Sequence, residues 1–205
     1  MTLDQWIQMS VAIGTLAVAV TAIWGQRIAH AIGLGPSLRL ELVDALGELI
    51  ISRSGDGSSS ELRYYHVRVS NAHRWAQATN VRVVITAISK PSADGTLARQ
   101  ALVCPLQLMW RFSNFHPQYS IVGPDDIADI GHVTPGLGFT LTPFVFPNNF
   151  TGSLHPHEQM RVELRAVADN GESQALCLDI SWDGAWSTDT LTMATHLVVK
   201  TPACT

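Results

Sequence analysis

The stretch WIQMSVAIGTLAVAVTAIW, from Trp6 to Trp24, divides this chain into two parts. It holds 19 residues and no charge, and at a helical rise of ~1.5 Å it is about 28 Å long, close to the hydrocarbon thickness of a bilayer. Its apolar side chains point all round a helix, which is typical of a membrane span. The sequence therefore predicts a transmembrane helix within residues 1–26, bound to the lipid bilayer through residues 6–24.

A cleaved secretory signal is the main alternative for this segment, with Ala29-His30-Ala31 as a cleavage site. The residues before the apolar run include Asp4 and lack Lys and Arg. The run is also longer than the apolar region of about 7 to 15 residues in a signal peptide. We therefore expect an anchor that is retained.

The orientation of the anchor depends on its flanks and on the cysteines. Arg27 and, further on, Arg39 place positive charge on the C-terminal side, which favours the cytoplasm for that side. Cys104, Cys177 and Cys204 are an odd number at wide spacing, typical of a reducing compartment, and Cys177 lies in an apolar run that predicts a buried, unpaired thiol. We expect a single-pass protein of the inner (cytoplasmic) membrane with a cytoplasmic C-terminal domain.

Small residues recur in the span, with Ser10 and Gly14 four positions apart. This spacing lets two helices approach closely, so Ser10 and Gly14 are candidates for a helix–helix contact in a homo-oligomer. Small residues are also common in any membrane helix, and the pair by itself does not decide between the two interpretations.

The rest of the chain has the pattern of a β domain. Residues 27–36 are interpreted as a juxtamembrane connector and residues 37–205 as the domain. In Leu38 to Leu42 apolar and charged residues alternate, which predicts a half-buried strand. Further strands are predicted at Glu48–Ser52, Leu62–Ser70, Asn80–Ile88, Ala101–Phe112, Phe139–Phe146, Met160–Ala168, Gln174–Trp182 and His196–Lys200.

Eight or nine short strands with turn residues between them indicate a mainly β fold, a β-sandwich of immunoglobulin-like or C2-like shape. A closed barrel is the alternative architecture. A mobile hairpin loop is predicted at Ser54–Ser60 and a short helix at Ser187–Thr195, which begins at a Ser/Thr/Asp cap.

Catalytic chemistry is not indicated by any motif. GxxxxGK[ST], HExxH and GxSxG are absent, so we expect no enzyme, no cofactor and no bound metal. His155-Pro156-His157-Glu158 fits a solvated turn better than a zinc site, because its spacing matches no standard ligand pattern. The net charge of −4 gives no long-range attraction to nucleic acid, so we expect no nucleic-acid partner.

Two places are candidates for a binding surface. Asp125 and Asp126, with Asp129 close by, could offer oxygen ligands to calcium, although Gly123-Pro124-Asp125-Asp126 is more economically a turn. Trp186 follows Asp183-Gly184 and is a candidate for a surface anchor or a lid over a pocket, with packing as the competing interpretation.

The remaining aromatic residues of the domain are expected mostly in the core. Trp110 and Trp182 occupy predicted inward positions, and Phe139, Phe144 and Phe146 fall on one predicted strand.

Several strings resemble a recurrent group of bacterial proteins with a single span and a β-rich domain. They are YYHVRVSN from Tyr64, HPQYSIVGPDDIADIGHV from His116, FTLTPFVFPNNF from Phe139 and LDISWDGAW from Leu178. Where the group has Arg-Arg-Trp, this chain has His73-Arg74-Trp75. The resemblance covers most of the chain and implies the architecture, but it brings no activity.

Three functions are compatible with these features. The first is a membrane-anchored, non-enzymatic binding or sensing module that recognises a protein or small ligand in the cytoplasm. The second is a membrane-disrupting effector, for example in antiviral defence, in which a ligand assembles the domains and the clustered helices perturb the bilayer. The third is a periplasmic carbohydrate-binding or hydrolytic domain, which requires the opposite topology.

Overall fold

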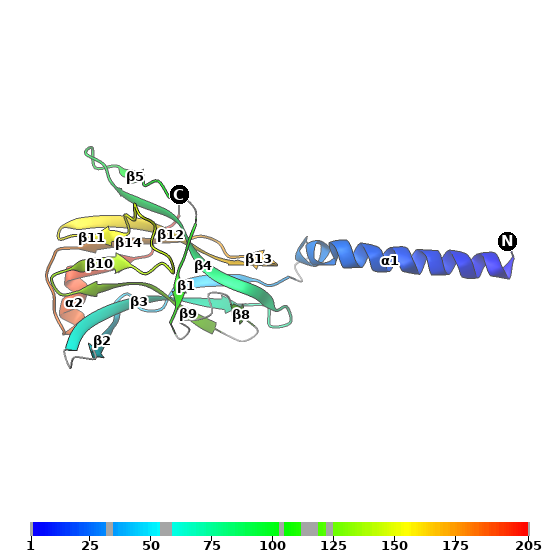
Figure 1. Cartoon of the computed structure of the whole chain (residues 1–205), viewed down its shortest axis with the longest axis horizontal. Helices are drawn as coiled ribbons and strands as arrows, with labels where there is room; N and C mark the ends of the chain where they lie inside the picture. The colour runs from blue at the N-terminus through cyan, green and yellow to red at the C-terminus, as the bar shows by residue number, and fades with distance from the viewer. Residues whose placement is uncertain are drawn as a thin grey trace.

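A computed structural model describes residues 2–31, 35–53, 59–102, 105–111, 119–121 and 125–204. Strands hold 49% of the chain, and they form two curled antiparallel sheets that follow one N-terminal apolar helix (Figure 1). The predicted fold class, mainly β with a β-sandwich after an N-terminal helix, is confirmed.

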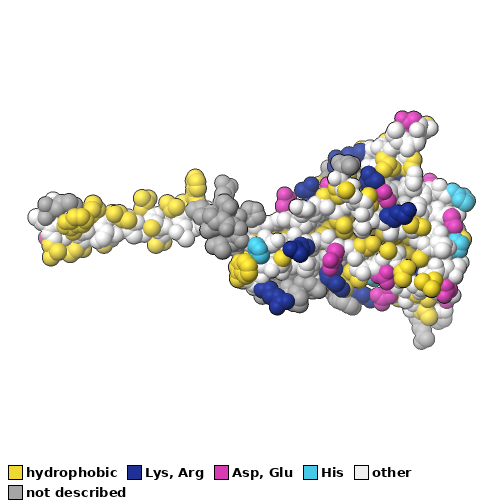
Figure 2. All heavy atoms as spheres, turned by 180° about the vertical axis from the view of Figure 1, so that it is seen from behind, with side chains coloured by type: hydrophobic (Ala, Val, Ile, Leu, Met, Phe, Trp, Pro, Cys, Tyr) yellow, Lys and Arg dark blue, Asp and Glu magenta, His cyan; other side chains and the backbone are white. Residues whose placement is uncertain are grey.

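Helix α1, Leu3–Ala31, extends away from the β-domain (Figure 1). Its segment Leu3–Gly25 is long and apolar enough to cross a membrane, and none of it is buried by the rest of the chain. Hydrophobic side chains follow the helix along the face seen in Figure 2. A signal sequence has the same properties. The helix continues beyond residue 26 because no Gly or Pro interrupts it before Gly33.

The first sheet has the strand order β1-β3-β9-β10-β11, with β2 paired to β3 and β7 paired to β9. All of these pairs are antiparallel. Its strands are β1 (Leu38–Leu42), β2 (Glu48–Arg53), β3 (Ser59–Asn71), β7 (Met109–Trp110), β9 (Asp125–Thr134), β10 (Gly138–Leu141) and β11 (Ser153–Leu154).

The second sheet has the order β15-β14-β12-β4-β5, with β13 paired to β12 and both β6 and β8 paired to β4. Its strands are β4 (Ala78–Pro91), β5 (Leu97–Arg99), β6 (Leu106–Gln107), β8 (Tyr119–Ile121), β12 (Glu158–Ala168), β13 (Gly171–Glu172), β14 (Leu176–Trp182) and β15 (Leu197–Lys200). The short helix α2, Thr190–His196, precedes β15 and is capped by Asp189, as the sequence predicts.

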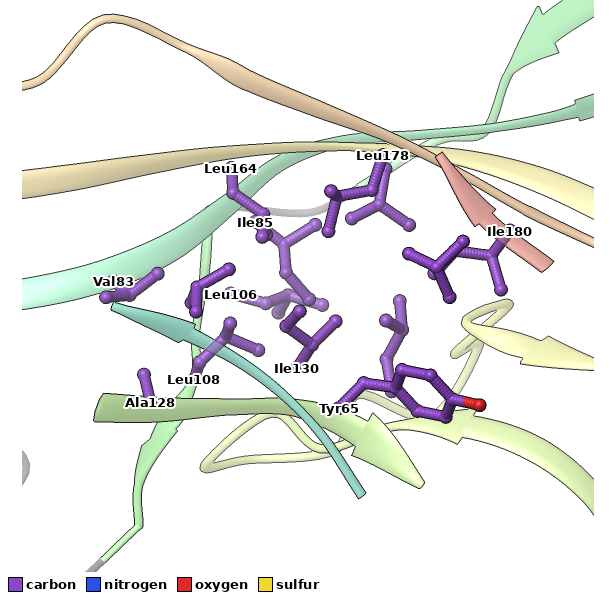
Figure 3. Close-up of a cluster of buried hydrophobic side chains, with 14 of the residues drawn as sticks. Tyr65, Val83, Ile85, Leu106, Leu108, Ala128, Ile130, Leu164, Leu178 and Ile180 are labelled. Carbon is purple, nitrogen blue, oxygen red and sulfur yellow. The ribbon is translucent and has the colours of Figure 1, made fainter. Parts of the chain in front are cut away.

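The hydrophobic core lies between the two sheets, where alternate residues of facing strands meet (Figure 3). From the first sheet come Tyr65 and Ile130, and from the second come Ile85, Leu164 and Leu178. Trp110 and Trp182 are also buried, as predicted from their positions. On the face of the domain in Figure 2, side chains of both charge signs are interspersed.

Two long predicted strands are shorter than expected. The segment predicted as Ala101–Phe112 contains β6 and β7, which belong to different sheets, with Leu108 between them paired to Pro143. Strand β10 ends at Leu141, because Pro143 has no N–H to continue the ladder. Phe144 and Phe146, predicted in the core, are therefore in a loop and are exposed by 43% and 56%.

Strand β9 lies where the sequence predicts a turn. Asp125 and Asp126 begin this strand, which is central in the first sheet and pairs with β3 and β10. Ala128 and Ile130 point into the core and are buried, whereas Asp129 pairs with His66 on the other face. The aspartates on the outer face interrupt the apolar pattern expected of a strand. The prediction of a turn was therefore wrong for Asp125 and Asp126, the described residues of that segment.

Cys177 and Cys204 form a disulfide, with their Cα atoms 5.4 Å apart. Cys177 is buried, as expected, but the prediction that it is an unpaired thiol was wrong. The 27-residue separation passes through α2 and β15, and only the fold brings the two cysteines together. The cysteine argument for a reducing compartment therefore fails, whereas Cys104 lies outside the described residues.

Candidate functional site

The β-domain has two distinct ends, which strand β3 connects. At one end Asn71 accepts a hydrogen bond from the backbone N–H of Ser37, just after the connector. Eight residues earlier, Arg63 donates to the carbonyl of Thr188 at the start of α2. At ~3.3 Å per residue these ends are about 26 Å apart. We call them the tether end and the far end; α1 leads to the first and α2 lies at the second (Figure 1).

A cavity of about 650 Å³ lies at the far end, where the ends of four strands meet. The antiparallel register places Glu158 of β12 opposite Trp182 of β14, and Trp182 opposite Leu197 of β15. The last residues of β4 complete the wall. The cavity is lined by Lys90, Pro91, His157, Glu158, Gln159, Ser181, Trp182, Asp183, Thr195, His196 and Val198.

A tight backbone crossing shapes one wall of this cavity. Gly184 has φ of +100°, and a Cβ there would lie 2.7 Å from the Cβ of Pro156. Glycine is therefore required, because a larger residue would push the two loops apart. The backbone N–H of His157 donates to the carbonyl of Trp182 at 2.8 Å. This bond holds the loop of Pro156 and His157 against the end of β14.

His196 and Asp183 form a hydrogen-bonded pair on the cavity wall, with Nδ1 and Oδ2 2.8 Å apart. The bond from His196, together with one from the N–H of Ala185, lowers the pKa of Asp183 below its ordinary value of 3.8. Asp183 is thus a carboxylate at neutral pH and only accepts, so the Nδ1–H of His196 donates. When the ring is neutral, this tautomer has its lone pair on Nε2.

Lys90 and Glu158 form the second charged pair. The Lys90 Nζ donates to the carbonyl of Ser153 at 2.7 Å and lies 3.4 Å from Oε2 of Glu158. The N–H of His155 donates to the same carboxylate oxygen at 3.0 Å. That hydrogen bond is the main cause that lowers the pKa of Glu158, and Lys90 adds to it. Both carboxylates of the cavity are therefore ionised at neutral pH.

The cavity lining combines charged, neutral polar and apolar side chains. Each charged carboxylate already has a cationic or histidine partner, so the site does not concentrate one sign of charge. Ser181, Thr195 and Gln159 add neutral polar groups, while Pro91 and Val198 are apolar. Such a lining suits a neutral ligand that carries several hydroxyl or amide groups.

The structure does not bring the predicted surface residues together. Trp186 is at the far end, where it is partly buried and packs against the core. Asp126 lies opposite Val69 in the register, close to the tether end, and its carboxylate accepts from the N–H of Ile127. Asp125 precedes it on β9, opposite Ser70, and its side chain is outside the described part of the structure.

The predicted helix–helix contact residues are open to a partner. The hydroxyl of Ser10 donates to the carbonyl of Trp6 within its own helix. A Cβ at Gly14 would meet nothing within 4 Å. The single chain leaves this face of α1 free, and the oligomer remains a prediction.

A second polar cluster lies on the outer face of the first sheet. His66, only 5% exposed, has its Nδ1 2.9 Å from Asp129, and its Nε2 is 3.6 Å from Glu48. Arg111 pairs with Glu48 at 2.6 Å. Nearby, burial lowers the pKa of His132. In the ranges that the structure describes, no three His, Cys, Asp or Glu side chains are placed to hold a metal ion.

The cavity residues were not predicted as a site from the sequence. Asp183 and His196 are 13 residues apart, at the end of β14 and at the last residue of α2, so no spacing rule links them. The segment His155-Pro156-His157-Glu158 was identified, and it is the solvent-facing turn that was expected, with a positive φ of 67° at His157. Within this segment, His157 and Glu158 line the cavity and are the sequence signal that points toward it.

A scan against models of known protein families finds no match for this chain, and a search of curated proteins finds no relative.

Proposed function

We propose that this protein is a membrane-anchored, non-enzymatic binding module whose far-end cavity holds a small, neutral, multiply hydroxylated ligand such as a saccharide. The observation that supports it is the cavity of about 650 Å³, in which Glu158 pairs with Lys90 and Asp183 pairs with His196. Ligand sites of 300–1,000 Å³ are typical for small molecules. The distance from the tether leaves the opening accessible to a ligand in solution.

The chemistry of the lining favours a neutral ligand over a charged one. A charged ligand would gain from one member of each pair and be repelled by the other. Hydroxyl groups both donate and accept, so a sugar ring can satisfy Glu158 and Asp183 as acceptors and Ser181 or Lys90 as donors at the same time. Its C–H face can lie on Pro91 and Val198.

We place the β-domain on the oxidising side of the membrane. The disulfide between Cys177 and Cys204 supports this side, because disulfides persist in the periplasm and outside the cell and are rare in the cytoplasm. The opposing signal, Arg27 in the C-terminal flank, is a single charge. Alkaline phosphatase fused to the C-terminus should be active, and a green fluorescent protein fused there should be dark.

The function is tested by titration calorimetry of the full chain in detergent against neutral mono- and disaccharides. We expect saturable binding that Glu158→Gln and Asp183→Asn each weaken by at least about tenfold, because a hydrogen bond to a charged group contributes about 1.5–3 kcal/mol. The matched control is Glu172→Gln, the same change at the exposed hairpin of the tether end, which should bind as the unaltered chain does.

Failure of all saccharides to bind would exclude the proposed ligand class. Unchanged binding in both cavity variants would show that the ligand binds outside this cavity. Intact mass of the chain extracted from membranes tests the anchor separately, because a cleaved signal would remove the N-terminal residues.

One observation favours a hydrolase as a second candidate. The Asp183–His196 pair orients an imidazole with a lone pair on Nε2, which is the arrangement of a general base that activates water. Among the described residues, the side chain hydrogen-bonded to the ring of His196 is the carboxylate of Asp183. Turnover of a bound saccharide that His196→Gln abolishes would establish this candidate.

A further inference from the structure

The turn between β3 and β4 carries the most exposed tryptophan of the β-domain. Trp75 is 69% exposed, whereas Trp110 and Trp182 are buried. Single exposed hydrophobic residues are common on protein surfaces, so the exposure of Trp75 gains meaning from where the turn lies and from what holds it.

This exposed ring is held in place. Trp75 stacks on the ring of His73, with centroids 4.6 Å apart. The Nδ1 of His73 lies 2.7 Å from the carbonyl oxygen of Gly35, to which it donates. The carboxamide of Asn71 accepts from the N–H of His73 and donates to the carbonyl of Ala76, so the turn is fastened at both ends.

The same contacts fasten the turn to the connector that follows α1. The N–H of Ala72 donates to the carbonyl of Ser37 at 2.9 Å, and Gly35 and Ser37 follow the last residue of α1, Ala31, by only four and six positions. The hairpin of β12 and β13 packs on the connector from the other side, where a Cβ on Gly171 would lie 3.2 Å from Cγ of Pro36. Trp75 is thus at the tether end.

The length of the connector limits how far this end can lie from the membrane surface. From Trp24 to Ala31, seven helical residues give about 10 Å, and the four residues to Gly35 add at most ~14 Å. The headgroup layer is itself about 5–7 Å thick. These lengths keep the turn within about 24 Å of Trp24, a reach that includes the headgroup layer.

The residue types of the turn also match the headgroup layer. Indole rings favour this layer because they have an apolar body and one N–H donor. Arg74, next to Trp75, is exposed and can bind lipid phosphates. The two tryptophans that bracket the span, Trp6 and Trp24, have the same preference.

We propose that Trp75 and Arg74 insert into the headgroup layer of the bilayer that α1 spans. The domain then stands on its turn at residues 72–77, and the far-end cavity opens away from the membrane. This inference rests on the membrane anchor of the proposed function but not on the ligand.

The test uses the full chain in nanodiscs that contain phosphatidylcholine with a nitroxide on the headgroup. In the background Trp6→Phe/Trp24→Phe, headgroup nitroxides should quench part of the tryptophan emission, and adding Trp75→Phe should abolish that quenching. Adding Trp186→Phe instead is the matched control and should leave it. Trp75 is 69% exposed, so Trp75→Phe should fold. Circular dichroism checks the folding of every variant, including Trp186→Phe, whose ring packs against the core.

The outcomes separate the anchor from the docking. Quenching of Trp6 and Trp24 in the unaltered chain reports the span. If that quenching occurs but Trp75→Phe changes nothing in the double-Phe background, the docking is refuted and the anchor stands. Trp75 emission that acrylamide quenches freely would place the ring in water, and emission that neither quencher reaches would indicate a protein partner; each result overturns the proposal.

Discussion

Each end of strand β3 has a buried polar side chain that binds neighbouring loops, Arg63 at the far end and Asn71 at the tether end. At the far end Arg63 is completely buried and donates to the carbonyls of Leu46, Gly47 and Thr188. At the tether end Asn71, also buried, binds the connector and the turn that carries Trp75. In both places a buried polar side chain ties neighbouring loops to the sandwich.

The surroundings of the two residues differ. The loops that Arg63 holds lie at the same end as a cavity of about 650 Å³ with paired charges. The segments that Asn71 holds border a hollow of about 720 Å³, and beside it they present an exposed indole and an arginine. A cavity of this kind suits a soluble ligand, and an exposed Trp–Arg turn suits a lipid surface. One buried polar residue at each end thus fixes the local loops, and the two ends of this small domain present different surfaces.

The largest effect is expected for Arg63→Met. The substitution keeps much of the volume but leaves the carbonyls of Gly47 and Thr188, among others, without their donor. Each unsatisfied buried group costs about 1–3 kcal/mol, so we expect the free energy of unfolding to fall by about 4 kcal/mol. Urea denaturation followed by circular dichroism measures it.

The control for this change is Arg74→Met at the exposed turn, which should alter stability by no more than about 0.5 kcal/mol. Arg63→Met should also leave the lipid quenching of Trp75 unchanged, provided that it is measured where the variant is folded. Equal destabilisation by the two arginine variants would refute the role given to Arg63.

The next effect concerns the disulfide, which closes a loop of 27 residues around α2 and β15. Removing a cross-link of that length costs about 3 kcal/mol, mainly through the freedom that the unfolded chain regains. We expect Cys204→Ser to lower the unfolding free energy by this amount. A reducing agent should produce the same loss in the unaltered chain and none in the variant.

At the tether end we expect a loss of about 2 kcal/mol for Asn71→Ala, because the N–H groups of Ser37 and His73 and the carbonyl of Ala76 lose their partner and water replaces it only in part. The exposed Asn148→Ala is the control and should be neutral. If Asn71 orients the turn, lipid quenching of Trp75 should fall in this variant while ligand binding at the far end stays intact. Loss of both together would mean that the two ends are not independent.

The sequence predicts the strands of this fold better than it predicts the residues that shape the two ends of the domain. Alternation in Leu38–Leu42 and in Met160–Ala168 is a local signal, and both segments are strands as predicted. Strand β9 was missed because its outward positions carry aspartates whose partners, such as His66, come from another strand. Local sequence propensity carries no information about contacts with another strand.

The candidate site and the disulfide depend on contacts between distant parts of the chain. Lys90 meets Glu158 across 68 residues, and Cys177 meets Cys204 only because β15 returns beside β14. Trp75 was given no position of its own among the aromatic residues, since a sequence does not show which ring lies on a turn that the connector holds at the surface. These features follow from topology and not from spacing.

The smallest effect tests the charge pair at the far end through pH. The pKa of Asp183 is below 3.8 in the folded chain, so the pair stabilises the fold above the ordinary pKa, and this contribution is lost as the pH falls through the lowered value. In His196→Asn the pKa of Asp183, followed by carboxyl ¹³C NMR, should rise toward 3.8. It should stay somewhat below it, because the N–H of Ala185 still donates to the carboxylate. Thr195→Ala, a change at the neighbouring residue, should leave the pKa where it is. An unchanged pKa in His196→Asn would show that the pair is not formed in solution, and the far end would then lack the oriented imidazole on which the hydrolase candidate depends.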